Sequence, residues 1–247
     1  MRPGHWHDWA ATMRAALDAT RRLGDRSNQA RTQRGLALGY VRLRRLDEAH
    51  RLLHEARDLY AQLSDLAGHA HTHLYQAWVF EAEGSYQQAL HQAGQALRIY
   101  REVGHRRGEA LALNAVGWFH ALLGQFQQAL NHCREALVMF NQLEEVDGQA
   151  ACVDSLGYAH HHLGDHQQAV AHYHRAIELY RAGGDRHKQA DALTHLGDVH
   201  HGDGDADAAR TAWQDAFDIL TELDHPDADA VREKLDLLGG PAVRSRR

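Results

Sequence analysis

The stretch ALALNAVGWFHALLGQFQQALNHCREALVMF, residues 110–140, decides the fold of this chain. Its apolar and small residues fall three and four positions apart, which is the period of an amphipathic helix. Gly124 interrupts this pattern, and Phe126 resumes it. The stretch therefore predicts two helices that fold back on each other, over roughly residues 107–123 and roughly residues 126–143.

The same pattern recurs at a fixed interval of 40 residues, and small residues occupy three of its columns. The columns are Ala30, Ala70, Ala110, Ala150 and Ala190; Ala49, Ala89, Ala129, Ala169 and Ala209; and Ala56, Ala96, Ala136, Ala176 and Ala216. A period of this size is typical of a solenoid, in which each repeat buries its apolar face against its neighbours. Glycine in the middle of a helix costs about 1 kcal/mol relative to alanine. Gly117, Gly157 and Gly197 therefore predict positions where two helices approach closely.

Glycine, aspartate and serine predict the helix ends. Asp165, Ser85 and Asp205 each follow a break in the pattern and are predicted to cap the next helix with their side chains. Between repeats, glycine is predicted to take the left-handed conformation that ends a helix. These glycines are Gly24, Gly104, Gly148, Gly183 and Gly184.

This pattern resembles the tetratricopeptide repeat. The resemblance rests on small Gly117 in the first helix, Gly124 at the turn, and Ala129 and Ala136 in the second helix. It covers residues 28–223, nearly the whole chain. The usual repeat of this family has 34 residues, so the helices or connections are longer here. Repeats of this length resemble those of kinesin light chain, of LGN-type polarity adaptors and of bacterial regulators.

The resemblance implies an all-α fold, a right-handed superhelical α-solenoid of helix hairpins. The expected parts are a leading half-repeat helix in residues 1–27, five full repeats in 28–223, a capping helix in 224–239 and a disordered tail in 240–247. In the capping helix, Leu235, Leu237 and Leu238 are predicted to be buried.

Residues 5–30, HWHDWAATMRAALDATRRLGDRSNQA, are similar to a particular junction. It starts the C-terminal repeat region of actinobacterial antibiotic-regulatory proteins of the SARP type and of related signalling ATPases. This resemblance implies a role in bacterial transcriptional or signalling regulation. The sequence has no GxxxxGK[ST] phosphate-binding loop and no DNA-reading helix pair, so neither ATPase activity nor DNA binding is carried over.

Composition narrows the function classes. The net charge is −6 and no long basic stripe occurs, so we expect no direct nucleic-acid binding. We expect no membrane association, since no apolar run is long enough to cross a bilayer. Cys133 and Cys152 do not form a disulfide framework, which suits a cytoplasmic protein. No nucleophile sits at a strained glycine turn. We expect neither an enzyme nor a cofactor nor a bound metal.

In the tetratricopeptide repeat family the first helices line a concave groove, and the resemblance places partner-binding residues there. The candidates are Arg34, Trp78, Asn114, Trp118, Asp154, Tyr158, His161 and His201. Aromatic anchors beside hydrogen-bonding groups are typical of a peptide-binding surface. In LGN-like and kinesin-light-chain-like repeats an asparagine at the position of Asn114 holds the peptide backbone. For Trp78 and Trp118, packing between adjacent first helices is the alternative.

The 22 histidines fall partly into columns at the repeat period. The columns are His120, His160 and His200; His161 and His201; and His132 and His172. Three interpretations stay open: packing between helices in place of a tyrosine, a pH-sensitive array, and metal binding by pairs such as His161 with His201 or His160 with His200.

The function we expect is binding of a protein or peptide partner in the groove. A small-molecule or metal sensor is one alternative. A scaffold that self-associates through the N-terminal half-repeat, around Trp6 and Trp9, is the other.

Overall fold

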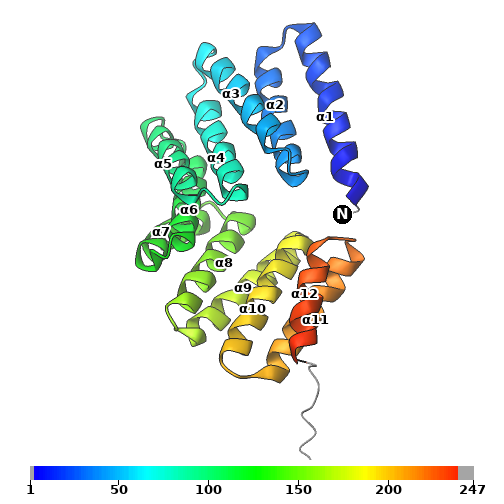
Figure 1. Cartoon of the computed structure of the whole chain (residues 1–247). Coiled ribbons are helices and arrows are strands. Elements are labelled where there is room, and N and C mark those ends of the chain that lie inside the picture. The colour runs from blue at the N-terminus through cyan, green and yellow to red at the C-terminus, as the bar shows by residue number, and fades with distance from the viewer. Residues whose placement is uncertain (1–2, 239–247) are drawn as a thin grey trace, which may run out of the picture. The chain divides into compact units, whose positions relative to one another are not determined.

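The computed structural model describes residues 3–238, with side chains from residue 7 onward (Figure 1). Its helices are α1 (Pro3–Leu23), α2 (Arg26–Arg42), α3 (Leu46–Gln62), α4 (Leu66–Ala82), α5 (Tyr86–Glu102), α6 (Arg106–Leu122), α7 (Phe126–Gln142), α8 (Val146–His162), α9 (His166–Gly183), α10 (Arg186–Gly202), α11 (Ala206–Glu222) and α12 (Asp227–Leu238). No strand occurs between residues 3 and 238, so the predicted all-α fold is confirmed. No helix in this range is long and apolar enough to cross a membrane.

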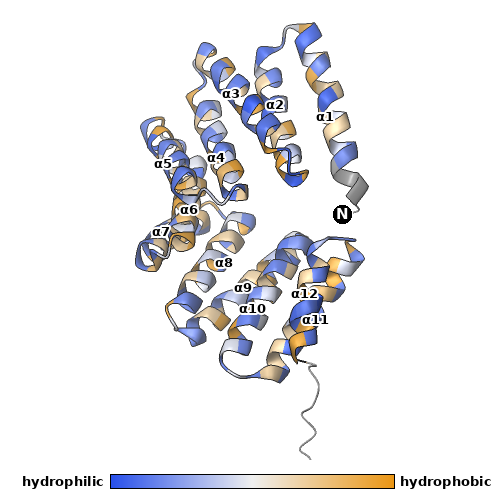
Figure 2. Cartoon of the chain, in the orientation of Figure 1, coloured by the Kyte–Doolittle hydropathy of each residue, from blue (hydrophilic) through white to orange (hydrophobic). Residues whose placement is uncertain are grey.

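The chain divides into two compact parts at Gly148. Residues 3–148 hold α1 to α7, in which α2 and α3, α4 and α5, and α6 and α7 pack as hairpins. The first helices of these hairpins also contact each other, α2 with α4 and α4 with α6. Residues 149–238 hold the hairpin of α10 and α11, followed by α12. Apolar residues share each helix with polar ones (Figure 2), as expected where a helix buries one face.

A left-handed residue follows each helix from α1 to α11, at intervals of 20 residues. These residues are Gly24, Arg44, Ser64, Gly84, Gly104, Gly124, Glu144, Gly164, Gly184, Gly204 and Asp224. The next backbone N–H bonds back to a helix carbonyl, as in the 3.0 Å bond from Asp165 N to His160 O. This is the usual hydrogen bond of a helix that ends in a left-handed residue. The 40-residue repeat is therefore two equal halves.

Gly148 does not take the left-handed conformation predicted for it. It lies in the first turn of α8, and a Cβ there would overlap the ring of Phe140. Gly68 and Gly108 lie in the same way against Tyr60 and Tyr100. Glycine at this position makes room for an aromatic ring. In the turn before Gly148 the left-handed residue is not a glycine.

That residue, Glu144, has φ 55°. The left-handed conformation costs a residue with a Cβ about 1–2 kcal/mol. Glu144→Gly is therefore expected to raise the free energy of unfolding by about 0.5–1 kcal/mol, after the entropy that glycine adds to the unfolded chain. Urea unfolding measures the change. The control is Asn131→Gly at an exposed position inside α7, which is expected to lower stability. A loss of stability in both variants would contradict the left-handed conformation of Glu144.

Two of the three predicted side-chain caps are confirmed. The carboxylates of Asp165 and Asp205 accept hydrogen bonds from Gln168 N at 3.4 Å and Ala208 N at 3.0 Å. Ser85 makes no side-chain cap, so that prediction is wrong. The serine side chain is one atom shorter than that of aspartate. Its hydroxyl makes no hydrogen bond to an N–H of the first turn of α5.

The close approaches predicted at the mid-helix glycines are confirmed. A Cβ on Gly117 would overlap Cys133 Sγ, one on Gly197 would overlap the Trp213 ring, and one on Gly157 would lie 3.0 Å from the Tyr173 ring. The first and second helices of each hairpin therefore touch at these positions.

The C-terminal helix buries a different residue from those expected. In α12, Val231 is 3% exposed whereas Leu237 is 76% exposed, so the predicted burial of Leu237 is wrong. Leu235 and Leu238 are partly buried. They share a helix face with Val231, and Leu237 lies off that face because successive residues turn by about 100°. The predicted tail, residues 240–247, lies outside the described residues.

Candidate partner-binding site

Within residues 3–148 the candidate site is the face formed by α2, α4 and α6. Arg34, Trp78, Asn114 and Trp118 all lie on these helices and are partly exposed. Leu74, one repeat after Arg34, is buried. The face of α2, α4 and α6 is therefore mixed: it is apolar in places, and it is polar at Arg34 and Asn114.

Arg34 is held between aromatic rings. Its guanidinium carbon lies 5.2 Å from the ring centre of Tyr75 and 5.8 Å from that of Tyr60. One guanidinium nitrogen, Nη1, donates to Tyr60 Oη at 3.4 Å. These contacts fix the plane of the guanidinium at the wall of an open cavity of about 320 Å³, which Arg31, His71 and Tyr100 also line.

Arg31, Arg34 and Asp65 are the charged residues that line the cavity, so arginine outnumbers aspartate there. The pKa of His71 is lowered to about 4, first because the ring is buried and then because Arg34 and Arg107 lie near it. Burial also raises the pKa of Tyr100 to about 12, against the pull of the same two arginines. Both rings are therefore neutral at pH 7. Such a site suits a carboxylate, which a guanidinium binds with paired hydrogen bonds.

Asn114 carries an unsatisfied hydrogen-bond acceptor. Its Oδ1 atom is buried and has no partner in the described part of the chain. A buried acceptor left unpaired costs about 1–3 kcal/mol, so native proteins rarely keep one without a use. A ligand N–H at this point would satisfy it.

The two predicted tryptophans combine packing with exposure. Trp118 Nε1 donates to Glu81 Oε1 at 2.7 Å, which links α6 to α4. Trp78 packs against Tyr75 on its own helix, with ring centres 4.8 Å apart. Both rings stay partly exposed. Their role in binding stays a prediction.

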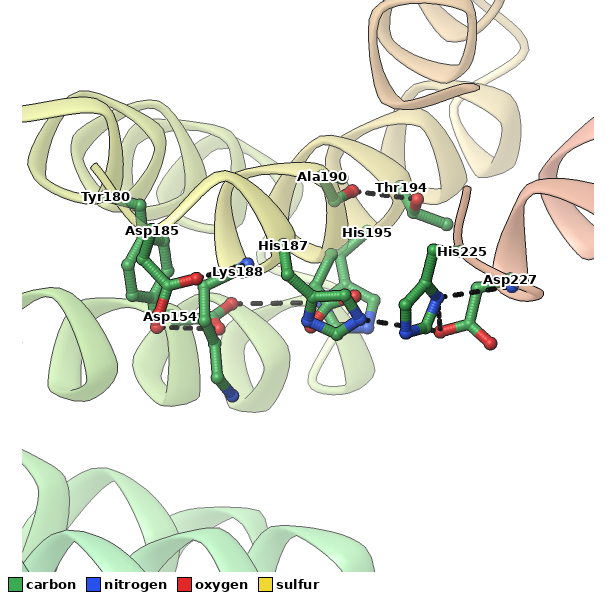
Figure 3. Close-up of polar contacts among 11 residues, drawn as sticks. Asp154, Tyr180, Asp185, His187, Lys188, Ala190, Thr194, His195, His225 and Asp227 are labelled. Atoms are coloured by element: carbon green, nitrogen blue, oxygen red, sulfur yellow. Dashed lines mark hydrogen bonds and ion pairs between the residues drawn. The ribbon is translucent and has the colours of Figure 1, made fainter. Parts of the chain in front are cut away.

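The other predicted residues lie in residues 149–238, and Asp154 belongs to a group of polar side chains there (Figure 3). Asp154 Oδ2 accepts from Tyr180 Oη at 3.3 Å, and Asp154 Oδ1 lies 3.8 Å from His195 Nδ1. Burial opposes protonation of His195, but the nearby carboxylates of Asp154, Asp191 and Asp198 outweigh it and raise the pKa of His195. The ring of Tyr158 packs against His162, with centres 4.4 Å apart.

His161 and His201 do not share one cluster. The His161 ring lies 5.1 Å from that of His162 and 5.6 Å from that of His166, and burial lowers its pKa. His201 is exposed and lies against Trp213. Among the described residues, the group of three possible metal ligands with suitable spacing does not include His160, His161, His200 or His201.

The first and third histidine columns pack on each other. His120 stacks on His132 with ring centres 5.4 Å apart, and His160 stacks on His172 at 5.3 Å. His160 is buried, with Nδ1 3.3 Å from Asp165. These contacts favour the packing interpretation for both columns.

Comparisons with known proteins agree with this fold. Two sequence models described as tetratricopeptide repeat match residues 110–147 and 149–222. The chain contains tetratricopeptide repeats. Its helices and close-packed glycines are thus those of a family of interaction scaffolds. No curated protein sequence matches the chain.

Solved structures of other proteins share the tetratricopeptide repeat fold. BtubC (BKLC) from P. vanneervenii is 19% identical with TM-score 0.68, over 98% of this chain and 95% of that chain. A signal transduction ATPase with numerous domains from Pyrococcus horikoshii, which has a tetratricopeptide repeat sensor, is 19% identical with TM-score 0.63. The match covers 89% of this chain and 35% of the ATPase.

A Rap protein complexed with competence and sporulation factor is 16% identical with TM-score 0.62. That match covers 86% of this chain and 64% of the Rap protein. The chain therefore spans about two thirds or less of the ATPase and of the Rap protein. At these identities the likeness shows the fold alone.

Proposed function

We propose that this protein binds an extended, acidic segment of a partner protein on the face of α2, α4 and α6. The observation that carries the proposal is the buried, unpartnered Oδ1 of Asn114 on the helix face that also presents Arg34. An unpaired acceptor and a fixed guanidinium together match the two polar features of an acidic peptide, its backbone N–H and its carboxylate.

The spacing of the helices sets the length of the segment. Packed helices lie about 10 Å apart, so Arg34 on α2 and Asn114 on α6, two helix steps away, are about 20 Å apart. An extended chain advances about 3.3 Å per residue. About six residues therefore separate the carboxylate at Arg34 from the backbone N–H at Asn114. The exposed parts of Trp78 and Trp118 lie on the helices between and beside them and offer apolar contact.

The comparisons support the class of partner and a regulatory context. One structure of similar fold is a Rap protein in complex with competence and sporulation factor, and another is an ATPase with a tetratricopeptide repeat sensor. We infer by likeness that this chain serves in bacterial regulation, and that it does so by binding and without a catalytic step.

The proposal is tested by selecting binders to the full chain from a random peptide library. Selected peptides are expected to carry an acidic residue about six positions from the segment that Asn114 holds. Arg34→Ala is expected to weaken the best peptide about 10- to 100-fold, because hydrogen bonds to a charged group contribute about 1.5–3 kcal/mol. Asn114→Ala is expected to weaken it about 3- to 10-fold. Calorimetry measures both.

The matched control is Arg98→Ala, which removes an exposed arginine from the second helix α5. It is expected to leave affinity unchanged. Circular dichroism establishes that each variant keeps its helices. Peptides without acidic residues, or folded Arg34→Ala and Asn114→Ala variants that bind like the wild type, would place the site elsewhere.

A further inference from the structure

His187, His225 and Asp227 bring three metal-ligand atoms together in residues 149–238 (Figure 3). His187 lies in the first turn of α10, His225 in the segment before α12, and Asp227 at the start of α12. Their ligand atoms all lie within 4.8 Å of one another. His187 Nε2 is 3.7 Å from Asp227 Oδ2, and His225 Nδ1 is 3.3 Å from the same oxygen.

These separations are close to those of a metal site. Bonds of about 2.0–2.1 Å in a tetrahedral site place ligand atoms about 3.3 Å apart. The rings of His187 and His225 have centres 4.3 Å apart, so both imidazoles already face one small volume. Small side-chain rotations are enough to bring the three donors onto one ion.

His187 is also oriented for this role. Its Nδ1 lies 3.4 Å from a carboxylate oxygen of Asp191, one helical turn later on α10. A carboxylate on one ring nitrogen commonly fixes a ligating histidine so that its other nitrogen faces the metal. That other nitrogen, His187 Nε2, is buried without a hydrogen-bond partner among the residues described. A metal ion there would satisfy it.

We propose that His187, His225 and Asp227 bind a divalent transition-metal ion, with Zn²⁺ the best fit. Two imidazoles and one carboxylate favour zinc over calcium or magnesium, which prefer sets of oxygen ligands. Three protein ligands leave one coordination position open to water or to a donor from a partner molecule. The site is independent of the proposed peptide-binding face and departs from the expectation of no bound metal.

The repeat explains why the site occurs once. His187 and Asp227 are 40 residues apart and so hold matching positions in successive repeats. The same position holds Ser27, Ala67, Arg107 and Asp147 in the earlier repeats. Asp147 and His187 also pair a carboxylate with a histidine, but Asp185 takes the place of His225 there, so a second histidine is missing.

The test is a titration of the full-length, untagged, chelator-treated chain with Zn²⁺ by calorimetry, with the melting temperature read in parallel. We expect one equivalent of Zn²⁺ to bind tightly and to raise the melting temperature of the protein. His187→Ala and His225→Ala are each expected to weaken that equivalent at least 10-fold. Asp191→Asn is expected to weaken it roughly 10- to 100-fold, because loss of a carboxylate bonded to a metal-bound histidine has effects of this size.

The matched control is His166→Ala, which removes one ring from the cluster of His161, His162 and His166 and is expected to leave the tight equivalent intact. Co²⁺ in place of Zn²⁺ gives a visible spectrum that reports four-coordinate binding, which His225→Ala should abolish. The proposal is overturned if no tight equivalent binds. It is also overturned if the equivalent survives in folded His187→Ala and His225→Ala, or is lost in His166→Ala.

Discussion

Gly117→Ala is expected to lower the free energy of unfolding by about 1–3 kcal/mol, although alanine is the better helix former. A Cβ at this position would overlap Cys133 Sγ and lie 3.1 Å from the carbonyl oxygen of Ala129 and 3.2 Å from the backbone N of Cys133. Both backbone atoms belong to the facing helix α7, so α6 and α7 must move apart. Urea unfolding measures the loss.

Gly94→Ala is the matched control, because it makes the same chemical change inside α5 where nothing lies within 4 Å of the new methyl group. It is expected to raise stability by about 0.5–1 kcal/mol through helix propensity alone. In the double variant with Cys133→Ala, the sulfur is gone and part of the cost of Gly117→Ala should disappear, a coupling that a double-mutant cycle isolates. Equal effects of Gly117→Ala and Gly94→Ala would contradict the close approach of α6 and α7.

Acidification is expected to destabilise the protein by about 2 kcal/mol between about pH 7.5 and about pH 5 through His71 alone. The folded-state pKa of His71 is lowered to about 4, whereas the unfolded chain titrates near 6.5. Between these values the unfolded state binds the proton and the folded state does not, so stability falls as the pH drops. Burial also lowers the pKa of His69 and His73, which adds to the loss.

His71→Gln isolates this contribution. The variant is expected to lose about 2 kcal/mol less than the wild type over the same pH range, measured by urea unfolding. A nuclear magnetic resonance titration of the His71 ring is expected to give a midpoint near 4. A midpoint near 6.5, or an equal loss of stability in variant and wild type, would show that the ring is not buried in its neutral form.

Much of the fold could be predicted because the repeat period, the helix spacing and the small columns all follow from one geometric constraint, hairpins that pack only on their neighbours. The error at Gly148 shows the limit. Glycine serves both as a left-handed residue and as space for a ring, and the sequence does not distinguish them. Glu144 takes the positive φ without any local signal, since the hairpin geometry imposes it.

The candidate site was harder to predict, because it depends on side-chain contacts between neighbouring repeats. The column positions place Arg34 and Asn114 on the first helices, and the column of Tyr60 and Tyr100 could have indicated the cavity. The bond from Trp118 to Glu81 spans 37 residues and follows from side-chain rotamers that periodicity does not set.

The metal-ligand cluster needed the structure for a related reason. His187 and Asp227 do lie one period apart, but their column mixes residue types, and His225 belongs to a different column. Only the turn before α12 brings the third ligand to the other two.

The most direct test of the account is a crystal structure of the full chain with its best selected acidic peptide. The proposed binding mode predicts a peptide carboxylate bonded to the Arg34 guanidinium and a peptide backbone N–H bonded to Asn114 Oδ1, about six residues apart. A peptide that leaves Asn114 Oδ1 unpaired and lies on the second helices would contradict it.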